Sequence, residues 1–386
     1  MRRCCLITSL ITITVIAIFL LQLTPVEFAW GSVTPETEAP SALLMEAHTG
    51  KIIYEKNPHQ RRAPASVTKV ATLLVAIDAL KNGKVKWNDR VVTSEAAWEM
   101  GGSEIWLEPG EEMSFKEMMI AISVGSANDA CVAVAEHIAG SEKAFVGLMN
   151  QKVKDLGLKN TRFVNAHGLP AKGHYTSAYD MAVLCREAAQ CPEFLELTSI
   201  KHYHKLRGGK TKLDNTNKLL WWYDGTDGFK TGWTTEANYC LASTVKRDDL
   251  RLICCVFGVP KIGGHFEESM KLYNWGFANF AFRQLVKPGE VVGELRVGKG
   301  TMDHVGVIAP EGAGILMPKG EDKKVKTEIV LLPFLSAPVS QGDPVGELKI
   351  IVDGKTSEKV PLVAQRDISR GSFWRLLKKS FRSIAS

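Results

Sequence analysis

A serine and a lysine three residues apart, Ser66 and Lys69, stand at the start of a long apolar segment that ends near Ala79. The apolar residues of this segment recur at helical spacing, which predicts a buried helix with Ser66 in its first turn. Residues three apart share one face of a helix, so the lysine amine can reach the serine hydroxyl. Burial lowers the pKa of a lysine and lets it serve as the base for a nucleophile. The same residues also fit a helix cap followed by a lysine that extends to solvent.

A second polar interruption, Ser126-Ala127-Asn128, lies between helices predicted over 114–124 and 129–139. Connections between packed helices are short, so this one places a hydroxyl and a carboxamide at a fixed position near the core. The alternative is a plain turn in which Asn128 or Asp129 caps the following helix.

A third polar group lies in a predicted strand that runs from Phe229 to Trp233 and contains Lys230, Thr231 and Gly232. Such a strand suits a peptide that binds as an added strand, with Gly232 leaving room for close approach of a backbone. A lysine in a strand is also a common protection of a sheet edge.

Two further polar residues could be functional. His167 lies in a loop, where it could be a ligand or a base, although loop histidines are more often structural hydrogen-bonding residues. Asp180 lies in the first turn of a predicted helix, where the helix dipole alone accounts for a carboxylate.

The elements that must position these groups are of mixed type. A hairpin is predicted around residues 48–50, and further helices over 142–156 and 267–278. Strands are predicted over 229–233, 239–246 and 250–259, and an antiparallel meander is their simplest assembly. We therefore expect an α+β fold in which an antiparallel sheet carries a helical subdomain.

Composition divides the rest of the chain. The catalytic domain is predicted over 33–283, and a small all-β domain, a β-sandwich, over 286–366. The second domain is predicted from short alternating runs separated by glycine, proline and aspartate, and it has no evident catalytic residue. We expect it to be a pedestal, with protein docking as the alternative.

The two ends of the chain predict export and attachment to a membrane surface. Residues 1–29 contain two arginines, a long uncharged run and a small-residue exit, as a secretory signal does, with an uncleaved anchor as the alternative. Residues 370–386 place apolar side chains on one helical face and basic ones on the other, which predicts a helix lying in an anionic membrane surface. The expected location is the extracytoplasmic face of the cytoplasmic membrane.

Charge and cysteine content exclude other classes. The formal charge of +6 comes from the two ends, because Arg2, Arg3 and the five basic residues of the tail leave a body near −1. No nucleic-acid partner is therefore expected. The cysteines of the body fall in apolar patterns, and only Cys185 and Cys191 lie in plausible loop-closing range, so we expect free thiols, no metal and no cofactor.

The three motifs together, Ser66-x-x-Lys69, Ser126-Ala127-Asn128 and Lys230-Thr231-Gly232, resemble the ordered set of penicillin-binding proteins and class A β-lactamases, with alanine where the middle motif usually has aspartate. With the segments APASVTK, FVNAHGLP and DGFKTGWTTEANYC, nearly the whole mature chain resembles the low-molecular-mass penicillin-binding proteins, which are serine-type D-alanyl-D-alanine carboxypeptidases. The resemblance implies a β-lactamase/transpeptidase-like catalytic domain. It further implies removal of the terminal D-alanine from peptidoglycan stem peptides, a role in cell-wall synthesis, and inhibition by β-lactam antibiotics.

The resemblance also implies catalytic roles. Ser66 would be the acylated nucleophile and Lys69 its general base. Ser126 would relay the proton to the leaving group, and Asn128 would hold Lys69 and the substrate amide.

For substrate binding, the resemblance implies that Lys230 and Thr231 receive the terminal carboxylate, beside Gly232. The backbone N–H groups of Ser66 and Trp233 would form the oxyanion hole.

Two residues depart from the family pattern. At Asn238 relatives usually have glycine, and at His265 many have an arginine that helps to hold the substrate carboxylate. A neutral His265 would weaken that grip, while the nucleophile and base are unaffected.

Two other activities share this machinery, and a non-catalytic role is a third alternative. A β-lactamase would also have to deacylate quickly, and the region around His167 does not resemble the loop that class A enzymes use for this. A non-catalytic wall-binding protein would not need the intact Ser66 and Lys69. A D,D-endopeptidase remains compatible with the sequence.

Overall fold

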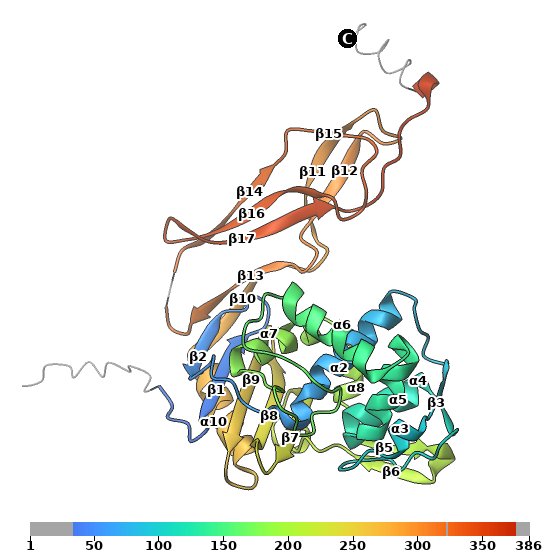
Figure 1. The fold of residues 1–386 in the computed structure, drawn as a ribbon. Helices are drawn as coiled ribbons and strands as arrows, with labels where there is room; N and C mark the ends of the chain where they lie inside the picture. Colours follow the sequence, from blue (N-terminus) through green and yellow to red (C-terminus); the bar gives the residue numbers. More distant parts are fainter. Residues whose placement is uncertain (1–33, 322, 376–386) are drawn as a thin grey trace, which may run out of the picture. The chain divides into compact units, whose positions relative to one another are not determined.

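The computed structural model describes residues 34–321 and 323–375. Within this part, an α+β domain is followed by a β-rich domain (Figure 1). The predicted signal segment 1–29 lies outside the described residues, as does the predicted tail helix from residue 376 onward. No helix in the described part is both long and apolar enough to cross a membrane.

The first domain is built on a five-stranded sheet in which every neighbouring pair is antiparallel. Its order is β2 (Ile52–Lys56), β1 (Ser41–Glu46), β9 (Leu250–Val259), β8 (Asn238–Arg247) and β7 (Thr226–Thr234). The predicted hairpin and the predicted meander are both confirmed. β7, which carries the lysine and threonine of the third motif, is an edge strand.

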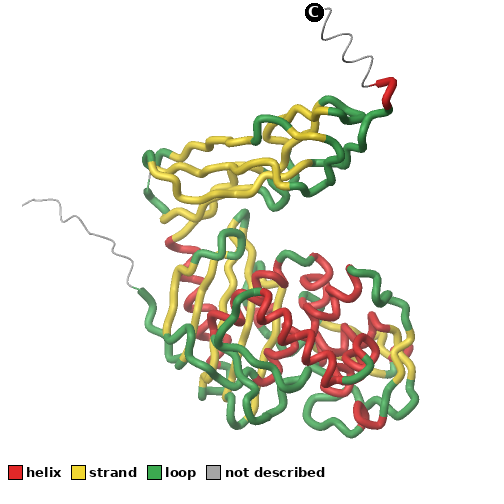
Figure 2. Tube along the Cα trace, turned by 45° about the horizontal axis from the view of Figure 1, so that its top comes forward, coloured by secondary structure: helices red, strands yellow, loops and turns green. Residues whose placement is uncertain are grey.

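Both faces of this sheet are covered, because side chains alternate along each strand. On β9, Ile253 and Phe257 belong to the core shared with the helices, whereas Leu252 and Cys254 belong to a second core beneath α10 (Gly264–Asn279). In Figure 2 most helices of this domain lie together on one side of the strands. A sheet packed on both faces gives β7 a rigid support.

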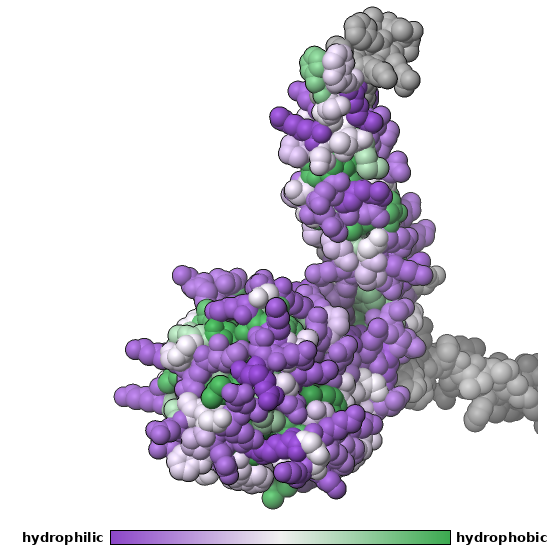
Figure 3. Space-filling view, turned by 90° about the vertical axis from the view of Figure 1, so that its right-hand side faces the viewer, coloured by the Kyte–Doolittle hydropathy of each residue, from purple (hydrophilic) through white to green (hydrophobic). Residues whose placement is uncertain are grey.

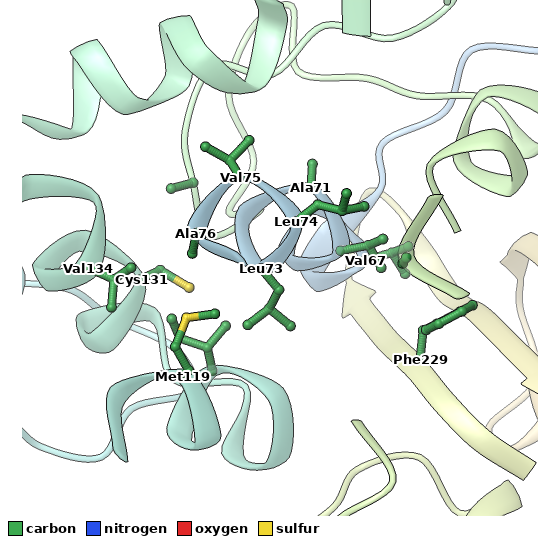
Figure 4. Packing of buried hydrophobic residues seen from close by; sticks show 14 of the residues in the cluster. Val67, Ala71, Leu73, Leu74, Val75, Ala76, Met119, Cys131, Val134 and Phe229 are labelled. Carbon is green, nitrogen blue, oxygen red and sulfur yellow. The ribbon is translucent and has the colours of Figure 1, made fainter. Parts of the chain in front are cut away.

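The helix that follows the predicted nucleophile lies in the core of the helical subdomain. A 3₁₀ turn, η1 (Ala65–Thr68), contains Ser66 and leads directly into α2 (Lys69–Lys81). All residues of α2 from Lys69 to Ile77 are buried, which confirms the predicted buried helix. Figure 4 shows apolar side chains around α2, among them Met119, Cys131, Val134 and Phe229.

The other helices of this subdomain are α4 (Phe115–Ile120), α5 (Asn128–Ala139), α6 (Glu142–Asp155), α7 (Ala178–Ala189) and α8 (Pro192–Thr198). The predicted helix over 114–124 begins with the expected capping box, in which Ser114 and Glu117 satisfy each other's backbone N–H groups. It differs from the prediction at its end, because α4 passes into a π-helical turn, η2 (Ala121–Gly125), which ends at Ser126. Such turns widen a helix locally and are frequent at functional sites.

A lobe and a hairpin border this subdomain. The lobe contains β3 (Arg90–Val92), α3 (Glu95–Trp98) and β4 (Glu112–Ser114). The hairpin, which the sequence pattern did not predict, consists of β5 (His202–Leu206), the turn η3 (Arg207–Gly209) and β6 (Thr211–Asp214), and the short helix α9 (Leu219–Trp222) follows it. Arg207 joins hairpin to lobe through two hydrogen bonds to Glu111, 2.6 and 2.9 Å long.

The second domain has a core of its own. β10 (Phe280–Val286) pairs with β13 (Ala313–Pro318). A six-stranded sheet has the order β14 (Val325–Leu331), β16 (Pro344–Val352), β17 (Lys355–Ala364), β12 (His304–Ile308), β11 (Val291–Gly298) and β15 (Leu335–Ser336). Apolar residues of both ladders form one cluster, as the predicted all-β domain requires. Ile368, after the last strand, is part of that cluster and pairs with Val339.

The surface of the first domain is largely polar. Figure 3 shows one side of the molecule, where hydrophilic residues dominate and hydrophobic residues form small separate patches.

Cys185 and Cys191, the pair in loop-closing range, are both free thiols.

Candidate active site

The predicted nucleophile and base are joined by a hydrogen bond. The Nζ atom of Lys69 lies 2.9 Å from the Oγ atom of Ser66 and 2.7 Å from the Oδ1 atom of Asn128. A third hydrogen bond, 2.7 Å long, runs from the same amine to the backbone carbonyl of His167. The lysine can therefore hold a fixed position between the serine of the first motif and the asparagine of the second.

Burial makes Lys69 a better base than an ordinary lysine. Its side chain is fully buried, and burial lowers the pKa of Lys69 to about 8, although the charge of Asp129 acts in the opposite direction. Among the described residues, no carboxylate forms an ion pair with it. Its three partners are neutral oxygens, which accept hydrogen bonds without restoring the full cost of burying a charge.

The loop at 165–169 holds the nucleophile's turn in place. Gly168 has a left-handed backbone (φ 92°), and a Cβ atom there would lie 2.0 Å from the carbonyl oxygen of Ala65. Only glycine permits this approach. The hydroxyl of Thr72 also donates a hydrogen bond of 2.5 Å to the carbonyl of Ala166. The FVNAHGLP segment therefore packs against η1 and α2 and holds them in position.

His167 contacts Lys69 through its backbone carbonyl, and its imidazole ring has a structural role. Its Nδ1 atom accepts a hydrogen bond from the backbone N–H of Leu169, and Nε2 lies 3.4 Å from Glu142. Burial, with the positive charge of Lys69, lowers the pKa of His167 to about 3, so the contact with Glu142 involves a neutral ring. Of the two interpretations open at the sequence level, the structural one fits these contacts.

The second motif is shaped by its backbone. Ser126 is buried and has a left-handed conformation (φ 60°), which is uncommon for a residue with a side chain and is a form of strain often found at functional sites. The turn places Asn128 at the start of α5, where its Nδ2 atom donates a 2.6 Å hydrogen bond to the carbonyl of Gly101. Asn128 thus binds the lobe as well as the lysine, and it keeps one N–H for a ligand.

Asp129 has a structural role next to this motif. Its carboxylate accepts hydrogen bonds from the backbone N–H groups of Ile105 and Leu107, 3.0 and 3.1 Å long. It therefore fixes the lobe against α5. The sequence pattern did not predict this contact, because the lobe residues Ile105 and Leu107 are more than 20 positions from Asp129.

The third motif forms a polar site on β7. Lys230 is almost fully buried, and burial together with the charge of Lys69 lowers the pKa of Lys230 to about 7. Its Nζ atom lies 3.5 Å from the hydroxyl of Thr216, which lies 2.7 Å from the hydroxyl of Thr231. Thr216 was not predicted from the sequence. The group has two hydroxyls and a lysine without a carboxylate partner among the described residues, which suits an anionic ligand.

Gly232 brings this strand against the nucleophile's turn. A Cβ atom at Gly232 would lie 2.9 Å from the carbonyl oxygen of Pro64 and 3.0 Å from the backbone nitrogen of Ser66. The edge strand and η1 are therefore in direct backbone contact. This contact brings the first and third motifs together.

The two remaining predicted binding residues are linked by aromatic rings. Trp233 is 57% exposed and its ring centroid lies 6.1 Å from that of Tyr239, which in turn stacks on His265 at 5.3 Å. His265, in the first turn of α10, is 5% exposed, and burial lowers its pKa to about 4. The structure records no contact of His265 with Lys230 or Thr231, so its role in substrate binding stays a prediction.

Asn238, the other departure from the family pattern, has a physical explanation. Its backbone is left-handed (φ 56°) at the turn between β7 and β8. Glycine adopts this conformation freely, and asparagine is among the residues that tolerate it best. The substitution therefore keeps the turn.

A serine beside a buried lysine, next to an edge strand that offers lysine and threonine side chains, defines the geometry of serine acyl transfer. The family model of D-alanyl-D-alanine carboxypeptidase matches residues 30–261, and that of the penicillin-binding protein 5 C-terminal domain matches residues 280–370. The chain belongs to the D-alanyl-D-alanine carboxypeptidase family of serine peptidases, the low-molecular-mass penicillin-binding proteins.

Relatives cover nearly the whole chain. The D-alanyl-D-alanine carboxypeptidase DacF of Bacillus subtilis is 41% identical over 378 residues, which are 96% of this chain and 97% of that protein. DacA of Escherichia coli is 37% identical over 349 residues, with 88% of this chain and 86% of that protein covered.

Solved structures agree with the fold. Penicillin binding protein 5 from Haemophilus influenzae is 36% identical and has a TM-score of 0.71, with 88% of this chain and all of that one covered. Penicillin-binding protein D2 from Listeria monocytogenes, in an ampicillin-bound form, is 28% identical with a TM-score of 0.58, and covers 63% of this chain and 99% of its own. The predicted family, the fold class and the serine-type carboxypeptidase activity are thereby confirmed.

Proposed function

We propose that this carboxypeptidase removes the terminal D-alanine from peptidoglycan stem peptides that end in D-Ala-D-Ala, through an acyl-enzyme on Ser66. The Oγ atom of Ser66 attacks the carbonyl carbon of the penultimate residue while its proton passes to Lys69. The peptide C–N bond then breaks, the leaving amine takes up a proton, and water later hydrolyses the ester. The 2.9 Å contact between Lys69 and Ser66 is the observation that carries this proposal.

Lys69 is suited to be the base at neutral pH. With a pKa of about 8, roughly one lysine in ten is neutral at pH 7. An exposed lysine would be neutral in fewer than about one molecule in a thousand at the same pH. The lowered pKa therefore supplies the active form without a further charged partner.

Ser126 and Asn128 complete the proton path in this proposal. Ser126 would hand the proton to the leaving nitrogen, for which its buried hydroxyl at the end of η2 is suited. Asn128 fixes the lysine through its oxygen and has an N–H left for the substrate amide.

The polar site on β7 would bind the terminal carboxylate. Thr216 and Thr231 offer hydroxyl groups beside the ammonium of Lys230. A bound carboxylate would add the counter-charge that this buried lysine lacks, and charge-assisted hydrogen bonds of this kind are strong. A free terminal carboxylate therefore distinguishes an exopeptidase substrate from a mid-chain bond.

The edge strand gives the peptide a place to bind. β7 ends the sheet, so a substrate backbone can pair with it as an added strand. Since Gly232 lies against the turn at Ser66, a peptide paired with β7 would lie beside the nucleophile. Backbone N–H groups of Ser66 and Trp233 would then stabilise the oxyanion.

The same site would react with β-lactam antibiotics, which present a carboxylate and a reactive carbonyl. The ampicillin- and cefotaxime-bound forms of the Listeria monocytogenes relative support this proposal. In the carboxypeptidase the penicilloyl ester on Ser66 would be long-lived, whereas a β-lactamase would hydrolyse it quickly.

The experiment combines two reactions of the purified protein. Diacetyl-Lys-D-Ala-D-Ala should release D-alanine, and penicillin should leave a stable adduct on the peptide that contains Ser66. Rapid penicillin turnover would instead indicate a β-lactamase. The absence of both reactions would indicate that the fold is retained for binding alone. A cross-linked muropeptide in a parallel assay reports any additional endopeptidase activity.

We also propose that the enzyme is exported and bound to the extracytoplasmic face of the bacterial cytoplasmic membrane. The signal-like segment 1–29 and the amphipathic pattern of residues 370–386 support this location. The backbone N–H of Gly371 donates a hydrogen bond to the carbonyl of Lys299, and Arg375 still contacts Gly300 and Asp303 of the second domain.

Truncation after Gly371 tests the anchor without removing Ile368 from the core. The truncated mature protein should lose binding to anionic vesicles and keep its peptidase activity. A full-length variant with Lys378→Glu and Lys379→Glu serves as the charge control, and we expect it to bind weakly. A truncated protein that still sediments with the vesicles would contradict the proposal.

A further inference from the structure

The β5–β6 hairpin carries a cluster of three potential metal ligands that the peptidase chemistry does not use. They are His202 and His204 on β5 and Asp214 at the end of β6, and their ligand atoms all lie within 4.8 Å of one another. This is the one such group of histidine, cysteine and carboxylate side chains in the described part of the chain. We propose that this cluster binds a divalent transition-metal ion of the Zn²⁺ type.

The backbone of the hairpin dictates the grouping. Residues two apart in a strand point to the same face, which places both histidines together. His202 and Asp214 are directly opposite each other in the antiparallel register, where side chains are nearest neighbours. The register therefore brings His202 and Asp214 together, and His204 joins them from the irregular part of β5 between Tyr203 and Leu206.

The distances are those of a site that needs only small side-chain adjustments. The Nδ1 atom of His202 lies 2.5 Å from Oδ1 of Asp214, and Nε2 of His204 lies 3.7 Å from the same oxygen. Ligands of a tetrahedral zinc ion, with bonds of about 2.0–2.1 Å, are about 3.3 Å apart. The three side chains are half-exposed or more, so rotation about their χ angles can open the first distance and close the second.

The donor set selects the kind of ion. Imidazole nitrogens favour zinc, nickel and copper, whereas magnesium and calcium require mainly oxygen ligands. Two nitrogens and one carboxylate oxygen supply three ligands, and solvent can fill the fourth position. The exposed cluster thus leaves an open coordination position.

Neighbouring groups affect the site in opposite ways. The ring of Trp221 packs edge-on against His202, with centroids 5.3 Å apart, and so restricts its orientation. Lys212 lies two residues before Asp214, on the same face of β6, and its positive charge opposes a cation. Removing that charge should therefore tighten binding.

A metal ion in this cluster would go against the expectation, drawn from the sequence, that the chain binds no metal. The sequence contains a histidine pair with one residue between, His202 and His204, which is the spacing of ligands on a strand. The sequence pattern predicts no strand at these histidines, and Asp214 joins them only through the hairpin.

Isothermal titration of the untagged full-length protein in detergent measures the site directly. Zn²⁺ should bind with one ion per chain, and Mg²⁺ and Ca²⁺ should produce no binding heat at the same concentrations. Co²⁺ as a probe should produce a visible absorption band, which Zn²⁺ then abolishes by displacement.

Variants locate the ion. His202→Ala, His204→Ala and Asp214→Asn should each weaken Zn²⁺ binding at least about tenfold, and Lys212→Gln should strengthen it. His304→Ala removes an exposed strand histidine outside the cluster and should leave the affinity unchanged. Circular dichroism and the thermal midpoint without metal show that each variant is folded.

Two results would overturn the proposal. One is the absence of binding heat and of a Co²⁺ band at millimolar metal. The other is Zn²⁺ binding that persists in the His202→Ala, His204→Ala double variant, since the ion would then lie elsewhere. Both readouts are independent of peptidase activity, so they do not depend on the proposed reaction of Ser66.

Discussion

The amine of Lys69 lies 2.7 Å from the side-chain oxygen of Asn128, 59 positions later in the sequence. This contact joins the first two motifs, and the contact of Gly232 with Ser66 adds the third.

Replacing the base tests the first link. Lys69→Ala should lower the rate of Ser66 acylation by penicillin about 10³-fold, because general-base catalysis typically contributes about 10²–10⁴-fold. Labelled penicillin and rapid quenching measure this rate. Lys84→Ala, at an exposed lysine beyond the end of α2, is the matched control and should react at the normal rate. Equal rates in the two variants would exclude Lys69 as the base.

The pH dependence of acylation tests the state of the lysine. Since the pKa of Lys69 is lowered to about 8, the acylation rate should rise with pH and level off above about pH 8. Asn128→Asp would place a carboxylate against the ammonium, raise the pKa of Lys69 and move this rise to higher pH. An unshifted profile in that variant would mean that another group controls the rate.

Thr216 tests the proposed carboxylate site. Thr216→Val keeps the shape but removes the hydroxyl next to Thr231 and Lys230, so KM for the peptide should rise about tenfold, as for one lost hydrogen bond to a charged group. The acylation rate at saturation should change little. Thr356→Val, at an exposed threonine of the second domain, is the control. A fall in the saturated rate with constant KM would assign Thr216 to catalysis instead.

Gly232 tests the contact between β7 and the nucleophile's turn. Gly232→Ala would place a Cβ atom 2.9 Å from the carbonyl of Pro64 and push the strand from the turn, so acylation should fall at least about tenfold. Gly147→Ala is the control, because a Cβ atom there meets nothing within 4 Å and lies in a helix that favours alanine. Thermal unfolding shows that both variants are folded, and their acylation rates are compared at equal concentrations of folded protein.

The two buried lysines should also make stability depend on pH. The pKa of Lys69 is lowered to about 8 and that of Lys230 to about 7, so between about pH 7 and 10 the unfolded chain binds more protons than the folded one. Stability should therefore rise with pH across this range. Lys230→Met should reduce the slope in urea-unfolding measurements, and an unchanged slope would contradict the burial argument.

The sequence predicted those contacts that are local in the chain or that belong to a motif of the family. Ser66 and Lys69 are three residues apart at the start of a helix, so helix geometry brings them together. The meander that carries Lys230 followed from alternating apolar runs, and the family resemblance ordered the three motifs.

Contacts that depend on tertiary structure were not predicted. Thr216 reaches Thr231 only because the β5–β6 hairpin returns the chain to the edge of β7, and that hairpin has no strong alternating pattern. The carbonyls of His167 and Gly101 carry no sequence signal, since any residue has one. His265 was predicted to bind substrate from its place in the family pattern. Its ring packs against Tyr239 and Phe266, a contact that the sequence did not predict.

The most direct test of the whole account is mass spectrometry of the penicillin adduct in the wild-type and Ser66→Ala proteins, paired with release of D-alanine from diacetyl-Lys-D-Ala-D-Ala. The account predicts a stable penicilloyl group on the peptide containing Ser66 and D-alanine release in the wild type, with both lost in the variant. D-alanine release that continues in a folded Ser66→Ala protein, or an adduct on another residue, would contradict it.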